Sequence, residues 1–512
     1  MAVVHIPALC VICRGRFRRC WFCIAGRNIQ FGVTGPELMD DDIPILQNRR
    51  RLAGFAVLYA AVMLYSSTIV GPAGVNFVYQ PPSAALRAFL ATPFVEHGSD
   101  QRADWIGNLM MLVPFGFIVT GALWPRRLLL MRLPAAIMAM ALCIGVILAV
   151  KYLQLFFPPR TVTLNYMAAQ TIGALIGCCG WAVWYRVAKR VTARRDLVEA
   201  FVLILWLYTV ALILFALMPL DFALDSDDLT AQLLRLPSTV WAIPGTGRPL
   251  QVRALLVFMA GAAFCPVGML LTFSRQGVYR VHRKLPAVTV AGLFLTAGLY
   301  GLSLLVISAF PAAPSILYRS LGIVAGAAAL QWLVQRDPAV LRQSLRRLAP
   351  YLVVPYLLGV MLVNQLISIH WRSWHDLVHD LYPLGLLPLF DYYIVTKGEA
   401  AKNIVGHIVL YLPIGILLWL RYGEGIARRA AVVAAVLAFC VESARYFRPG
   451  LEGDFNSVVL AAIAATLGAN LMPPVWRMFA ELARRSGPGQ VRRWDKAKRV
   501  TDADPRVEIE NY

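Results

Sequence analysis

The sequence predicts an all-α membrane protein that crosses the bilayer about twelve times. Of its 512 residues, 59% are hydrophobic and 15% are charged, whereas soluble domains are about half apolar and about a quarter charged. Apolar stretches of about 20 residues, the length that crosses a bilayer as a helix, recur along the chain. Basic residues gather in every second connection between these stretches, as expected of cytoplasmic loops.

Twelve apolar stretches are long enough to be membrane-spanning helices. They lie at 52–70, 104–124, 134–157, 163–185, 198–219, 252–273, 287–309, 315–334, 350–368, 403–421, 430–447 and 455–478. The eighth, rich in Ala and Gly, has the weakest apolar signal.

The charges between the spans predict the orientation. Basic runs such as "PRRLLLMR", "RVAKRVTARR" and "RYGEGIARR" alternate with neutral or acidic connections such as "DFALDSDDL". Positive residues stay on the cytoplasmic side, so both termini are expected inside. The net charge of +21 therefore indicates contact with a lipid bilayer. It does not indicate nucleic-acid binding, because no soluble domain remains to present a groove.

A recurring Pro-x-Gly pattern predicts internal repetition. It occurs at Pro114/Gly116, Pro266/Gly268 and Pro413/Gly415, and a later proline follows at Pro158, Pro311 and Pro449, with Gly173, Gly326 and Ala464 fifteen residues further on. We interpret this register as three tandem four-helix units at 51–190, 198–335 and 350–480, each with a long external loop after its first span. A partly disordered cytoplasmic arm, 1–50, precedes them, and a basic cytoplasmic tail, 481–512, follows.

The first unit resembles the VanZ-like family of bacterial membrane proteins through "DWIGNLMMLVPFGF" and "KYLQLFFPPRTVTLNYMAAQTIGALIG". The positions that fit the family pattern are Asp104, Asn108, Pro114, Gly116, Gln154, Pro158, Arg160 and Gly173. Lys151 stands where the family has Glu and Gln170 where it has Asn, while Thr163 and Asn165 replace acidic residues.

The third unit resembles the same family through "NIVGHIVLYLPIGI" and "VESARYFRPGLEGDFNSVVLAAIAATLG". Glu442, Pro449 and Asp454 fit, whereas Asn403, His407, Arg445 and Leu451 replace the family's residues. In the middle unit Leu256, Ala260, Leu304 and Ile307 stand at the polar positions. The resemblance thus covers 52–185 and 350–478, with a degenerate unit between them.

The predicted orientation brings the polar residues of the outer units to the extracytoplasmic side. We expect them to form a substrate-binding site made of Asp104, Asn108, Lys151, Gln154, Arg160, Asn403, His407, Glu442, Arg445 and Asp454. The alternative is that they pair only to hold helices together, for example Lys151 with Asp104. If the two units face each other, Lys151 and Glu442 would pair across the interface.

Pro114 and Gly116 interrupt the helix beneath Asp104 and Asn108. They either expose backbone groups to the site or form a kink that a neighbouring helix fills. Both interpretations stay open at this point.

Two weak metal candidates occur, and no cofactor is predicted. Cys10, Cys13, Cys20 and Cys23 form two CxxC pairs, although residues 1–38 are equally consistent with poorly ordered sequence. His375 and His379 are four residues apart in "HWRSWHDLVHD", which equally suits an amphipathic helix at the membrane surface.

No phosphate loop, HExxH, GxSxG or Rossmann pattern occurs in a suitable context, so an enzyme is not favoured. The resemblance implies a role in the bacterial cell envelope, in the plasma membrane, because the family's founding member is associated with teicoplanin resistance. We expect a protein that binds or handles an amphiphilic envelope molecule, such as a lipid-linked precursor. The alternatives are a membrane-embedded enzyme with Glu442 or His407 as acid or base, and an accessory scaffold.

Overall fold

The computed structural model describes most of the chain between residues 49 and 486. The described residues are 49–68, 77–94, 99–125, 129–158, 162–194, 197–218, 220–223, 226–244, 249–276, 278–281, 285–307, 312–367, 371–373, 397–449, 451 and 453–486. Nearly all of the predicted arm and most of the predicted tail therefore lie outside the described residues.

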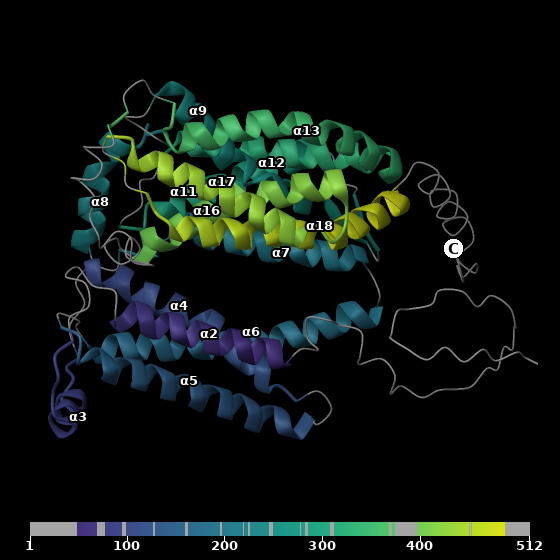
Figure 1. The fold of residues 1–512 in the computed structure, drawn as a ribbon. Coiled ribbons are helices and arrows are strands. Elements are labelled where there is room, and N and C mark those ends of the chain that lie inside the picture. Colours follow the sequence, from purple (N-terminus) through teal and green to yellow (C-terminus); the bar gives the residue numbers. More distant parts are fainter. Residues whose placement is uncertain are drawn as a thin grey trace, which may run out of the picture. The chain divides into compact units, whose positions relative to one another are not determined.

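The described chain is almost entirely helical, as predicted (Figure 1). The first predicted unit contains α2 (Arg49–Thr68), α3 (Pro82–Leu90), α4 (Ser99–Leu123), η2 (Leu129–Met131), α5 (Arg132–Gln154) and α6 (Leu164–Arg194). The middle one contains α7 (Leu197–Ala216), α8 (Ser226–Thr239), α9 (Leu250–Ala262), α10 (Cys265–Leu271), α11 (Leu285–Ser303) and α12 (Pro314–Leu333). The third contains α13 (Pro338–Val363), α16 (Lys397–Tyr422), α17 (Ala427–Tyr446) and α18 (Asn456–Ser486).

One small element was not predicted. The strands β1 (Phe273–Gln276) and β2 (Val278–Val281) pair antiparallel in the basic connection after α10. Their Phe, Val and Tyr residues favour extended backbone.

Eleven helices in the described part of the chain are long and apolar enough to cross a membrane. The chain is thus a multi-pass membrane protein. The predicted span 430–447 is also helical, as α17, but it is not among the eleven. The 20 residues of α17 carry Arg428 and Arg429 near one end and Glu442 and Arg445 near the other, so they contain no 18-residue stretch with fewer than three charges.

The prolines of the Pro-x-Gly pattern have different local effects. Pro114 lies inside the continuous helix α4 and Pro413 inside α16. In the middle unit the predicted span 252–273 is divided at Ala263 and Phe264 into α9 and α10, and Pro266 lies in the first turn of α10. A proline is tolerated there because its missing N–H would have no partner within the helix.

The glycine of each Pro-x-Gly pattern lies where two helices cross. A Cβ atom on Gly116 would overlap the carbonyl oxygen of Ala174, and one on Gly415 would overlap that of Ala465. The glycine of α10, Gly268, meets Ile323 in the same way. These glycines therefore let α4 and α6, α10 and α12, and α16 and α18 approach closely. The pairs α4 with α6 and α16 with α18 lie side by side in Figure 1. This contact supports the packing interpretation of Pro114 and Gly116.

A backbone hydrogen bond also recurs. In each predicted unit, an N–H in the loop that follows the first span donates to a carbonyl just after the third span, which is α5, α11 or α17. The bonds are Val78 N to Phe156 O at 2.8 Å, Ala223 N to Leu305 O at 2.7 Å and Arg372 N to Phe447 O at 2.7 Å. The three-unit grouping stays a prediction, and these recurring contacts support it.

The contacts correct the predicted register of the middle unit by one helical turn. Gly322 packs on Gly261 as Gly173 packs on Leu109, so the counterpart of Gly173 is Gly322 and not Gly326. The polar positions of the third helix are then Tyr300 and Ser303 in place of Leu304 and Ile307. The predicted register counted from Pro311, which follows the end of α11 by eight residues, whereas Pro158 follows the end of α5 by four.

Candidate functional site

The first polar cluster joins three helices of the first unit. Asn108 on α4 donates its amide to the backbone oxygen of Asp104 at 2.9 Å, and Gln170 on α6 donates to the side-chain oxygen of Asn108 at 2.9 Å. Asn108 and Gln170 are buried, whereas Asp104 is partly exposed. The helical spacing of Asp104 and Asn108 thus turns both toward α6, whose Gln170 was known only as a departure from the family pattern.

Lys151 and Gln154 extend this cluster on α5. The Lys151 ammonium, 5% exposed, donates to Oε1 of Gln154 at 2.9 Å and lies 5.8 Å from the ring centre of Tyr166. The Gln154 amide in turn donates to the backbone oxygen of Ser67 at 3.1 Å. The last turn of α5 is therefore tied to the end of α2 by an amide, and a positive charge is held beside it.

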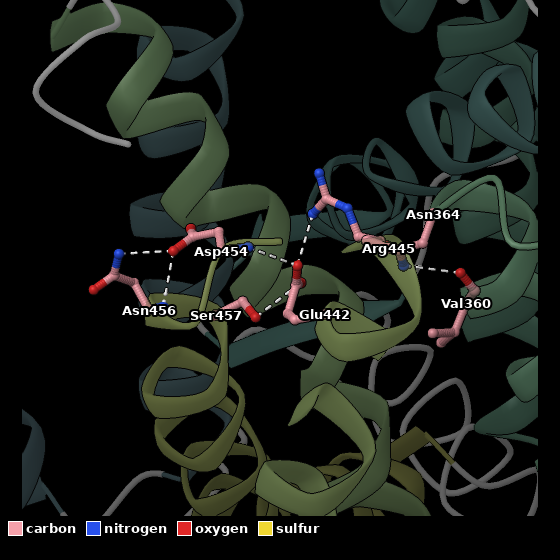
Figure 2. A network of polar contacts seen from close by, with 7 residues as sticks. All are labelled: Val360, Asn364, Glu442, Arg445, Asp454, Asn456 and Ser457. Atoms are coloured by element: carbon pink, nitrogen blue, oxygen red, sulfur yellow. Dashed lines mark hydrogen bonds and ion pairs between the residues drawn. The ribbon is translucent and has the colours of Figure 1, made fainter. Parts of the chain in front are cut away.

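The second cluster lies in the third unit and is centred on Glu442, whose side chain is fully buried (Figure 2). Its Oε2 accepts from Arg445 Nη1 and from the backbone N–H of Asp454, both at 2.9 Å. Its Oε1 accepts from the Ser457 hydroxyl at 2.9 Å. The carboxylate therefore joins the end of α17 to the start of α18.

Asp454 completes the turn between these helices. Its Oδ1 accepts from the backbone N–H of Asn456 at 2.8 Å and from the Asn456 amide at 2.7 Å (Figure 2). Gly453, beside it, lies against the Tyr446 ring and the backbone oxygen of Glu442, where a side chain would not fit. Asp454 thus caps the turn that leads into α18, two residues before the helix begins at Asn456.

The hypothesis that Lys151 pairs with Glu442 is wrong. Both oxygens of Glu442 are occupied by donors of its own unit, and Lys151 bonds Gln154 instead. The hydrogen bonds and ion pairs of Asn403, His407, Glu442, Arg445 and Asp454 involve no member of the first cluster. Of the ten predicted residues, those that form described hydrogen bonds therefore fall into two separate clusters.

His407 and Tyr411 on α16 lie beside the Glu442 network. Glu442, Asp454 and Arg445 act electrostatically on His407, and Glu442 and Arg445 also act on Tyr411. The Tyr411 hydroxyl is buried, and so is the Nδ1 atom of His407; neither has a hydrogen-bond partner among the described residues. The sequence analysis missed Tyr411, although it follows His407 by one helical turn and thus shares its face.

The remaining predicted residues are placed less closely or not at all. Asn403 is exposed on α16, one turn before His407, and forms no hydrogen bond with a described residue. Arg160, His375 and His379 lie outside the described residues, as do Cys10, Cys13, Cys20 and Cys23. Within the described ranges, no three His, Cys, Asp or Glu side chains come together as metal ligands would.

The two clusters differ in what they leave available. A carboxylate with three donors is held as a structural acceptor, because three of its four lone-pair sites are already used. The neighbouring His407 nitrogen and Tyr411 hydroxyl are uncommitted, and burying such groups without partners is unfavourable. The third unit therefore holds the clearer candidate for a ligand site.

Comparison with known proteins finds a similarity in the part of the chain that carries the first cluster. Residues 53–185 match the VanZ/LLP1 family model, a range that runs from α2 into α6 and contains every described member of that cluster. No curated protein and no solved structure matches the chain. Residues 53–185 are thus similar to the VanZ/LLP1 family, within a chain that is a multi-pass membrane protein.

Proposed function

We propose that this protein binds the polar head group of an amphiphilic molecule of the bacterial cell envelope, such as a lipid-linked precursor or a lipoglycopeptide, in the plasma membrane. The site would be the buried face of α16 next to the Glu442–Arg445 pair, with His407 and Tyr411 as the contacting groups. The charge distribution of the loops supports an outward-facing position for this end of α16. A role in resistance to teicoplanin would follow if such a lipoglycopeptide is the ligand.

The observation that carries the proposal is the Tyr411 hydroxyl, which is fully buried and has no partner among the described residues. Leaving such a group unsatisfied costs about 1–3 kcal/mol. A head group with hydroxyl, amide or phosphate oxygens would remove this cost on binding. The His407 nitrogen, one turn away, provides a second contact of the same kind.

A pair of tyrosine variants tests the proposal in the full chain in lipid nanodiscs. Tyr356→Phe is the matched control, because the Tyr356 hydroxyl donates to the backbone oxygen of Leu410 at 2.9 Å. With teicoplanin and a polyprenyl phosphate as probes, Tyr411→Phe should weaken binding of at least one probe by about threefold to tenfold. Its unfolding temperature should be unchanged or higher.

The control variant should behave in the opposite way. Tyr356→Phe should lose about 1 kcal/mol of stability and bind the probes as the wild type does. Equal binding by wild type and Tyr411→Phe for both probes would contradict the proposal. So would a loss of stability in Tyr411→Phe that matches that of Tyr356→Phe, because the hydroxyl would then have a structural partner.

A membrane-embedded enzyme is the second candidate, favoured by His407 and not by Glu442. The Glu442 carboxylate accepts three hydrogen bonds within the protein, so Glu442→Gln would change folding as well as chemistry. This variant therefore does not distinguish an enzyme from a binding protein. His407→Gln does: an enzyme would keep probe binding and lose turnover, whereas a binding protein would lose affinity. An accessory scaffold would tolerate both His407→Gln and Tyr411→Phe.

A further inference from the structure

Arg319 is a charged residue inside a predicted membrane span of the middle unit. It lies on α12, which begins at Pro314, and the side chain is partly buried. The corrected register makes it the counterpart of Gln170 in the first polar cluster. Arg319 was not predicted, because the uncorrected register put only apolar residues of this unit at the positions that are polar in the outer units.

The surroundings of Arg319 provide a flat apolar face and no acceptor. Its guanidinium carbon lies 5.5 Å from the ring centre of Phe264, in the turn between α9 and α10. No residue in the described ranges forms an ion pair or hydrogen bond with it. The nearby hydroxyls of Thr296 and Ser320 are 2.8 Å apart and bond each other.

Two arginines on other helices contrast with this one. Arg445 is paired with Glu442 at 2.9 Å, and Arg102 on α4 is paired with Asp228 at 2.7 Å. A cation within the hydrocarbon region is unfavourable unless it meets a counter-charge or water. Arg319 stacks on Phe264, whereas no acidic side chain in the described ranges forms an ion pair with it.

We propose that Arg319, stacked on Phe264, binds a phosphate-bearing anion at the junction of α9, α10 and α12. A guanidinium presents several N–H donors in one plane, which suits two phosphate oxygens at once. The position within a membrane span favours the phosphate of an anionic phospholipid over free phosphate. This site lies on other helices than His407 and Tyr411 and does not depend on the function proposed for them.

The test uses the delipidated full chain in detergent, with phosphatidylglycerol binding followed by native mass spectrometry. Arg319→Gln should weaken binding by about tenfold or more, and Arg319→Lys should weaken it less, because a lysine keeps the charge and loses the fork. Arg336→Gln is the matched control. Arg336 stacks on Trp332 at 4.9 Å just after the same helix, but it is exposed.

The outcomes separate the site from general attraction to negative lipid. Arg336→Gln should bind phosphatidylglycerol within about twofold of wild type. Equal losses in Arg319→Gln and Arg336→Gln would overturn the proposal, as would wild-type binding by Arg319→Gln. Competition by inorganic phosphate would support the site with free phosphate as its occupant, and lack of competition would support the lipid.

Folding is controlled separately. In a phosphate-free non-ionic detergent without added lipid, Arg319→Gln should unfold at the wild-type temperature or above it, because an unpaired charge has been removed. A lower unfolding temperature there would show that Arg319 has a structural partner and would overturn the proposal. Tyr411→Phe should leave phosphatidylglycerol binding at this site unchanged.

Discussion

Glu442 shows how one buried side chain can be structural although its type suggests catalysis. Its two oxygens accept from Arg445, from the Asp454 backbone and from Ser457. The ion pair is not fully enclosed by the protein, since the Arg445 side chain is 23% exposed. The charge on Glu442 therefore helps to hold α17 against α18. The His407 Nδ1 atom and the Tyr411 hydroxyl beside it have no hydrogen-bond partner among the described residues.

We expect Glu442→Gln to destabilise the protein by about 3 kcal/mol. The substitution removes the negative charge that pairs with Arg445, and it replaces one of the two acceptor oxygens by an amide group that donates. Chemical unfolding in detergent measures this loss. Glu481→Gln is the control, because Glu481 pairs with Arg484 and Arg485 on the partly exposed end of α18. It should change stability by less than about 1 kcal/mol. Similar losses in the two variants would contradict a clamp at Glu442.

At the scale of elements, close helix crossings explain the glycines better than flexibility does. Gly116 faces the backbone of Ala174, and Gly177 on α6 faces that of Val113 on α4. Between lipid-embedded helices such contacts gain dispersion energy, since apolar side chains alone are as well accommodated by lipid. Gly145 on α5 has open space around it and provides a comparison within the same unit.

Gly116→Ala should therefore destabilise the protein by about 1–3 kcal/mol, because its methyl group meets a backbone oxygen that cannot turn away. Gly145→Ala should be neutral or slightly stabilising, because alanine is the better helix former. Unfolding of the two variants in the same detergent gives the comparison. If Gly116→Ala is as stable as Gly145→Ala, the α4–α6 crossing is looser than described.

At the scale of the whole molecule, the orientation in the membrane remains a prediction from charge. The loops that follow the first span of each predicted unit should face outward, and the basic connections should face the cytoplasm. Exposed residues suited to labelling exist on both predicted sides: Tyr79, Trp241 and Trp371 outside, and Leu130, Arg336 and Tyr422 inside.

Single cysteines at these positions, in a variant whose nine native cysteines are replaced by alanine, test the orientation. A membrane-impermeant maleimide applied to intact cells should label the cysteines at 79, 241 and 371. Those at 130, 336 and 422 should react only after the membrane is opened. Labelling of 79 and 371 from opposite sides would rule out the three-unit arrangement and the outward-facing site together.

The sequence by itself determined the all-α membrane class and nearly all of the spans. It also determined the helical faces that carry Asp104, Asn108 and His407, and the resemblance of the first unit, which the match over residues 53–185 confirms. These features depend on hydropathy and helical period, which act within about 20 neighbouring residues. Only the tertiary structure decided that Glu442 bonds its own unit and not Lys151, and that the helix crossings of the middle unit lie one turn from the predicted register. It also decided that the Tyr411 hydroxyl and the Arg319 guanidinium form no hydrogen bond or ion pair with a described residue. The reason is that a hydrogen bond requires its atoms to meet within about 3 Å. One helical turn moves a side chain by about 5.4 Å, so a partner is settled only by the depth at which two helices cross.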